Sequence, residues 1–184
     1  MLYILVQAVW FMAPAMWSNM MPVWAKRIPL LDRLDKPIDG NKQLFAKPIL
    51  GRNKTYRGLV AGVASALVVG AAQWLLSEQW SAVNRLEFIE LDFSSYIILS
   101  LLLGFGAILG DALESFAKRQ VGVTPGKAWV PFDQIDYVIG AFLISAVYIQ
   151  LDTSQYLAAF FVGSIIHPIS TVIGWKLGLK DQPI

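Results

Sequence analysis

Long apolar runs alternate with short polar segments along the 184 residues of the chain. Crossing about 30 Å of hydrocarbon takes roughly 20 apolar helical residues, and five stretches approach or reach that length: 1–23, 58–77, 94–110, 135–151 and 156–179. The third can continue as helix through Lys118, and the fourth spans comfortably only if residues 132–136 already belong to it. The pattern predicts an all-α integral membrane protein, a bundle of about five transmembrane helices forming one domain over residues 1–184.

Composition agrees with a membrane protein, since 56% of the residues are hydrophobic and only 15% are charged. The first stretch lacks a charged residue and a basic leading region, so we expect it to stay as a membrane anchor rather than be cleaved as a signal peptide. The formal net charge of +2 is too small to indicate nucleic-acid binding. Small-residue spacings on the apolar stretches permit dimers without demanding them, so the oligomeric state stays open.

The basic residues predict the orientation. Nine Lys and Arg fall in residues 22–57, three in 111–134 and two after Trp175, whereas residues 78–93 hold one. The positive-inside rule therefore places the loops 24–57 and 111–134 and the C-terminus in the cytoplasm, with the N-terminus outside.

Acidic residues concentrate between the third and fourth stretches. Four polar residues fall at i, i+3, i+4 and i+7, on one face of a helix: Asp111, Glu114, Ser115 and Lys118. Asp133 and Asp136 follow at the start of the fourth stretch. Carboxylates at a membrane boundary are costly unless paired or bound to a cation, and Mg²⁺ favours a few carboxylates together with substrate phosphates. We expect Asp111, Asp133 and Asp136 to hold Mg²⁺, with Glu114 and Ser115 in support.

A simpler interpretation of the two later aspartates stays open. The dipole at the start of the fourth helix could stabilise them, or they could pair with Lys118 and Lys127.

A basic segment, GRNKTYRG at residues 51–58, precedes the second stretch on the same predicted face. Lys54 and Arg57 supply charge, Asn53 and Thr55 supply hydrogen bonds, and the free N–H groups at the start of the next helix favour an anion. The segment therefore predicts a polyphosphate site, the alternative being contact with lipid head groups.

Missing residue types narrow the chemistry. The chain has no cysteine and a single histidine, His167, which lies beside Pro168 in the fifth stretch and is expected at a helix kink. Neither a histidine-based triad nor a zinc site can be assembled. A nucleophile that is already ionised, such as a lipid phosphate monoester, needs no histidine base.

Three sequence elements in order resemble the CDP-archaeol synthase family, which is related to the phosphatidate cytidylyltransferases. The first is the family's Asn-Lys-Thr-aromatic-x-Gly loop, matched here by Asn53, Lys54, Thr55, Tyr56 and Gly58. The second is its Gly-Asp-x-x-x-Ser-x-x-Lys-Arg element, matched by Gly110, Asp111, Ser115, Lys118 and Arg119. The third is its Asp-x-x-Asp element, matched by Asp133 and Asp136. Phosphatidate cytidylyltransferases commonly carry His-Gly-Gly before the last element, where this chain reads AWVPFDQID. The difference favours the archaeal-type branch.

The resemblance implies a reaction at the cytoplasmic face of the cell membrane. CTP and a lipid phosphate in the bilayer, 2,3-bis-O-geranylgeranylglycerol 1-phosphate or a similar lipid, give a CDP-activated lipid and pyrophosphate with Mg²⁺ as cofactor. We expect the carboxylates to hold the metal and the basic residues to bind CTP and stabilise the leaving pyrophosphate, among them Lys54, Arg57, Lys118, Arg119 and Lys127.

Three other functions share some of these sequence features. A phosphatidate cytidylyltransferase acting on diacyl lipid would use the same elements, because nothing in the sequence measures the lipid tails. A CDP-alcohol phosphotransferase is disfavoured because its Asp-Gly-x-x-Ala-Arg element is absent. A small transporter or lipid-binding bundle would carry ionisable residues deep in its spans, where this chain has only His167.

Overall fold

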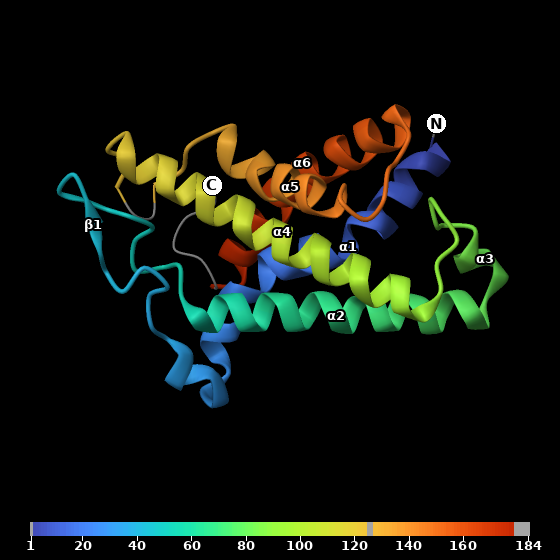
Figure 1. Cartoon of the computed structure of the whole chain (residues 1–184), viewed down its shortest axis with the longest axis horizontal. Helices are drawn as coiled ribbons and strands as arrows, with labels where there is room; N and C mark the ends of the chain where they lie inside the picture. The colour runs from blue at the N-terminus through green and yellow to red at the C-terminus, as the bar shows by residue number, and fades with distance from the viewer. Residues whose placement is uncertain (1, 125–126, 179–184) are drawn as a thin grey trace.

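Four long helices and one shorter helix make up most of the molecule (Figure 1). The computed structural model describes residues 2–124 and 127–178. Its helices, including one short turn, are α1 (Leu2–Trp24), α2 (Tyr56–Gln79), α3 (Ser81–Asn84), α4 (Phe93–Gln120), α5 (Phe132–Ser145) and α6 (Thr153–Lys176). Two 3₁₀ segments, η1 (Ala25–Arg27) and η2 (Pro29–Leu34), and a hairpin of β1 (Gln43–Leu44) and β2 (Lys47–Pro48) lie between α1 and α2. The described chain is mostly helical, as predicted, and this hairpin holds its only strands.

Within the described residues, the helices α2, α4 and α6 are each long and apolar enough to cross a membrane. The structure therefore supports a multi-pass membrane protein, while the count of five spans and the orientation of the termini stay predictions. Helix α1 has 23 residues and no charge, but it falls outside this group of three. Helix α5 has 14 residues and is about 21 Å long at 1.5 Å per residue, less than the hydrocarbon thickness.

The expected fourth span differs from the structure at its end. Helix α5 begins at Phe132, as the length argument required, but it ends at Ser145 rather than Leu151. Ile149 and Leu151 are buried against the core, so their apolar character reflects packing of the connection and not a longer helix. A capping box between Asp152 and Gln155 then begins α6.

Helix α4 continues through Lys118 to Gln120, which confirms the extension allowed by the sequence. The predicted loop 111–134 is therefore helical in its first ten positions and again from Phe132. The fifth stretch was expected to reach residue 179, which lies outside the described residues.

Glycines let α4 approach its neighbours closely. A Cβ at Gly106 would lie 2.5 Å from the carbonyl oxygen of Gly140, and one at Gly104 would lie 2.3 Å from the Cβ of Ala66. On another side of α4, the Ser18 hydroxyl donates to the carbonyl of Gly104 at 2.8 Å. Small residues thus bring α5, α2 and α1 against one central helix.

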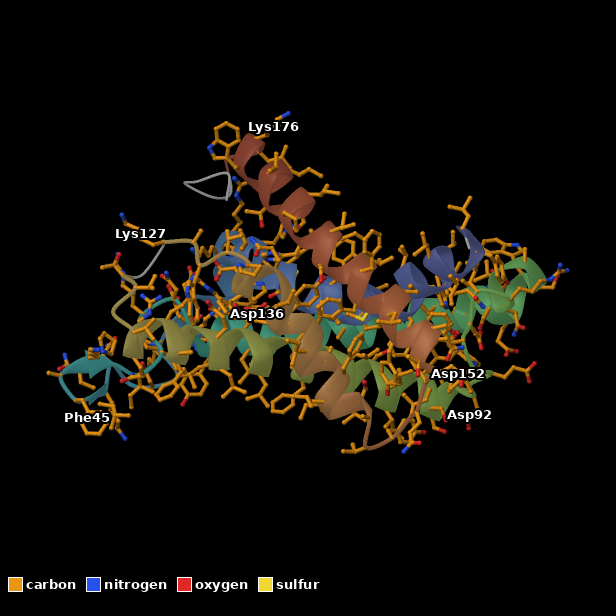
Figure 2. All side chains as sticks on the ribbon, turned by 90° about the horizontal axis from the view of Figure 1, so that it is seen from above. Phe45, Asp92, Lys127, Asp136, Asp152 and Lys176 are labelled. Atoms are coloured by element: carbon orange, nitrogen blue, oxygen red, sulfur yellow. The ribbon has the colours of Figure 1, made fainter. Side chains whose placement is uncertain are left out.

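The bundle has two distinct ends, which Figure 2 shows at the left and right. Phe45 and Lys127 lie at one, which we call the loop end because residues 25–55, 121–124 and 127–131 form it. Asp92 and Asp152 lie at the other, and Asp136 lies nearer the loop end. The loop end carries most of the basic residues and is the one the sequence predicts to be cytoplasmic.

Candidate metal and phosphate site

Three carboxylates from two helices meet toward the loop end. Asp111 and Glu114 of α4 and Asp136 of α5 each offer an oxygen, and these oxygens lie within 4.8 Å of one another. The contact between α4 and α5 explains the grouping, since a Cβ at Gly110 would lie 2.2 Å from the carbonyl oxygen of Asp136. With no side chain at Gly110, Asp136 lies directly opposite the acidic face of α4. We call these three residues the carboxylate cluster.

Glu114 is the buried member of the carboxylate cluster. Its side chain is 7% exposed, and its Oε1 accepts no hydrogen bond within the described part of the chain, although the Lys118 ammonium lies 3.4 Å away. Three anions this close repel one another, so a divalent cation fits among them. Residue spacing made Glu114 a support residue, whereas the structure places it in the group that could hold the metal.

Asp133 lies beside the cluster and is engaged by other groups. The Lys118 ammonium is 2.6 Å from its Oδ1, and the backbone N–H of Trp129 donates to its Oδ2 at 2.5 Å. This is the Lys118 pairing that the sequence left open as an alternative. Lys118, itself buried, therefore bridges Asp133 and Glu114.

Lys54 brings the basic segment 51–58 to the carboxylate cluster. Its ammonium lies 2.5 Å from Asp111 Oδ2, across 57 residues of sequence. Backbone hydrogen bonds hold the segment in place: the N–H of Ile38 donates to Lys54 O at 2.8 Å and the N–H of Tyr56 donates to Lys36 O at 3.0 Å. The predicted meeting of the basic and acidic elements is therefore present for this residue.

Asp39 fastens the start of the same segment. Its carboxylate accepts the backbone N–H groups of Leu50 at 2.8 Å, Gly51 at 3.1 Å and Asn41 at 2.9 Å. Partial burial acts to raise the pKa of Asp39, but these hydrogen bonds outweigh it and hold the pKa below its ordinary value. The sequence interpretation missed this residue, whose signal was the Asp-Gly turn pair before the basic segment.

Two residues of the basic segment have structural partners. Thr55 is the N-cap of α2, and its hydroxyl accepts the N–H of Gly58 at 3.2 Å. The buried Arg57 guanidinium pairs with Asp35 at 3.0 Å and Asp32 at 3.4 Å, both on or next to η2. These pairs direct Arg57 toward the loop rather than to the cluster, and they too were missed by sequence reasoning.

The remaining expected site residues divide by exposure. Asn53 and Lys127 are exposed, and Figure 2 shows Lys127 apart from Asp136. Ser115 is buried on α4. Arg119 is 6% exposed, and its Nε and Nη1 donate no hydrogen bond to any described residue. A buried guanidinium with unused donors suits an anionic partner such as a phosphate.

Comparisons with known proteins agree along the whole chain. The model of the CarS-like family, described as CDP-archaeol synthase, matches residues 1–184. A CDP-archaeol synthase from Thermococcus onnurineus is 29% identical over 180 residues, which cover 97% of this chain and 96% of that protein. Another, from Methanocaldococcus jannaschii, is 31% identical over 146 residues, or 79% of this chain and 81% of that protein. A solved structure of an intramembrane enzyme for archaeal membrane lipids biosynthesis matches with a TM-score of 0.72 and 26% identity, covering 90% of this chain and 92% of that one.

Proposed function

The chain belongs to the CarS-like family of CDP-archaeol synthases, and we propose that it transfers the cytidylyl group of CTP to an archaeal lipid phosphate. The products are a CDP-activated lipid and pyrophosphate. The observation that carries the proposal is the carboxylate cluster with Lys54 and Lys118 against it, at one end of a membrane bundle.

In the reaction, an oxygen of the lipid phosphate attacks the α-phosphorus of CTP in line with the leaving group. The new phosphorus–oxygen bond forms as the bond from the α-phosphorus to the bridging β-phosphate oxygen breaks, and pyrophosphate leaves with its charge. The attacking oxygen is already ionised at neutral pH, so no side chain has to take a proton. Catalysis rests on positioning and on neutralising phosphate charge.

We assign Mg²⁺ to the carboxylate cluster because hard oxygen ligands and a buried carboxylate oxygen without a donor suit that ion. Asp111, Glu114 and Asp136 would hold it, and Asp133 would orient Lys118. Bound there, the ion would supply charge neutralisation for the nucleotide phosphates.

The lysines act on the phosphates. Lys54 and Lys118 each pair with a carboxylate of the site, so each lies within reach of phosphates bound beside the same carboxylates. We place the triphosphate near Lys54 and the exposed Asn53, and assign the unused donors of Arg119 to a further phosphate contact. Arg57 and Lys127, which were expected to share this role, lie away from the cluster, and we assign neither to the reacting groups.

We place the site at the cytoplasmic face, where the loop end is predicted to lie and where CTP is found. The test is to incubate the protein, purified in detergent, with labelled CTP, Mg²⁺ and an archaeal-type lipid phosphate, with diacyl lipid phosphate as a second substrate. We expect a labelled CDP-lipid with the archaeal-type lipid. No CDP-lipid from either, under conditions where a known synthase is active, refutes the function.

A further inference from the structure

Helix α6 leaves the bundle in its second half. Ala158, Ala159, Val162 and Gly163 are buried in the first half, whereas Thr171 is the one buried residue of α6 after Pro168 within the described range. Figure 2 shows the ribbon of α6 rising away from the other helices toward Lys176. Proline inside a helix removes a backbone hydrogen bond and permits such a change of direction.

The divergence leaves a small open groove between α6 and the end of α1. Its walls include Asn19, Val23 and Trp24 of α1, and His167, Ser170 and Gly174 of α6. An amide, an imidazole and a hydroxyl therefore share one surface with aliphatic and aromatic carbon. We call it the α1–α6 groove.

One wall of this groove contacts α5, the helix that carries Asp136. The ring of His167 lies 5.8 Å from the ring of Tyr137, measured between centroids, and Tyr137 is the residue after Asp136. The Tyr137 hydroxyl donates to the carbonyl of Gly163 at 2.9 Å, which fixes α5 against α6 at this level. A ligand in the groove would thus lie beside the α5 segment that carries the metal-binding aspartate.

The groove and its rim carry polar groups that the described protein does not use. The side chain of Asn19 makes no hydrogen bond to any described residue, although a polar amide on a membrane helix needs a partner. Lys26 and Arg27 follow α1 at the loop end, and Lys176 is the last residue of α6. All three side chains are exposed, and none takes part in an ion pair of the described chain. Such a basic rim attracts an anionic lipid head group.

We propose that the α1–α6 groove binds the lipid substrate, a two-chain glycerolipid monophosphate, and admits its head group from the membrane to the carboxylate cluster. Lys26, Arg27 and Lys176 attract the phosphate, Asn19 donates to an oxygen of the glycerol unit, and Val23 contacts the first carbons of the chains. This inference rests on the proposed function for its choice of lipid, and it deepens that function by locating the lipid half of the site.

A kinetic test fills the groove from its α6 wall. Ser170→Phe should raise the KM for lipid phosphate about tenfold or more and leave the KM for CTP within about twofold, because only one substrate uses the groove. The matched control is Ile169→Phe, which adds an aromatic ring at the neighbouring position, 52% exposed and outside the groove. An unchanged KM for lipid phosphate in a folded Ser170→Phe protein overturns the proposal.

A second test does not depend on turnover or on that variant's folding. The photoreactive residue p-benzoylphenylalanine is placed at Val23 in the groove or, as control, at Val68, which is 68% exposed on α2. The protein is reconstituted without CTP into vesicles holding labelled archaeal-type lipid phosphate. We expect several-fold more lipid labelling from position 23, competed by unlabelled lipid phosphate and not by the neutral diether glycerol.

The other outcomes are distinct. Equal labelling from both positions, or equal competition by neutral lipid, indicates general lipid contact and overturns the proposal, as does a crosslinked dimer, which would indicate a second copy of the chain. Selective labelling without formation of any CDP-lipid supports the groove as a lipid phosphate site and refutes the proposed function instead.

Discussion

Replacing Glu114 by Gln removes one charge from the carboxylate cluster while keeping the size of the side chain. Glu114 is the member that sequence spacing ranked last and that the structure groups with Asp111 and Asp136. The substitution therefore distinguishes a metal site that includes Glu114 from the metal site expected from the sequence, which includes Asp133 instead. We expect Mg²⁺ binding to weaken and the metal-free protein to become more stable.

The expected free-energy changes follow from the distances between the charges. Two unit charges 4.8 Å apart, the upper limit within the cluster, repel by about 3 kcal/mol at an effective dielectric constant of about 20. Lys118, at 3.4 Å from Glu114, already offsets part of this repulsion, so the net gain is about 1–2 kcal/mol, a few degrees in Tm for a chain of this size. A neutral amide oxygen in place of the carboxylate should cost Mg²⁺ about 2–3 kcal/mol, or roughly 30- to 150-fold in affinity.

Two assays measure these opposite effects. Thermal unfolding in detergent is followed without CTP over a Mg²⁺ titration, and CDP-lipid formation is followed over the same concentrations. Glu90→Gln, at an exposed position near the other end of the bundle, is the control and should leave both curves unchanged. Wild-type Mg²⁺ dependence of both Tm and activity in Glu114→Gln refutes the assignment. Loss of that dependence in Asp133→Asn alone would restore the grouping expected from the sequence.

Three further substitutions test the surroundings of the site. Arg57→Met should lower the free energy of unfolding by about 1 kcal/mol, since its partners are largely exposed, and leave the KM for CTP unchanged; a large rise in that KM with an unchanged Tm would make Arg57 a nucleotide ligand. Asp39→Ala should speed hydrogen exchange at Leu50 and Gly51 at neutral pH and raise the KM for CTP. In the wild type, the hydrogen bonds from Leu50 and Gly51 to Asp39 persist at a pH above about 4, the ordinary pKa of an aspartate, and are lost only as the pH falls through the lowered pKa of Asp39. Equal exchange in both proteins would show that Asp39 does not hold this segment. Gly140→Ala should abolish folding, because its Cβ would lie 2.2 Å from the carbonyl oxygen of Gly106, whereas a variant with normal yield and Tm would show that α4 and α5 are less close.

The helices could be predicted because their signals are local. Apolar runs indicated α2 and α6 within a few residues, and the face shared by Asp111 and Lys118 predicted that α4 continues past the apolar run. The predicted end of α5 was wrong because tertiary packing, and not helix formation, explains the apolar residues after Ser145. Ile149 and Leu151 are apolar because they pack on the core after the helix has ended.

Membership of the site could be predicted only in part. The sequence grouped Asp111 with Asp133 and Asp136, whereas the structure groups Asp111 and Asp136 with Glu114. The difference depends on the contact between Gly110 and α5, which no local pattern specifies. Arg57 shows the same limit. Its charge suggested a phosphate ligand, while its partners lie more than 20 residues earlier, on a 3₁₀ turn folded back against α2.

One contact between helices links stability to chemistry in this molecule. Close approach at Gly110 brings Asp136 to the acidic face of α4, and the resulting group of anions would be costly at a membrane boundary without compensating charge. Lys54 and Lys118 supply part of that charge, at 2.5 Å from Asp111 and 3.4 Å from Glu114. Because the proposed reaction brings several phosphate charges to the same place, the two ammonium groups that stabilise the carboxylate cluster would also neutralise phosphates bound beside it.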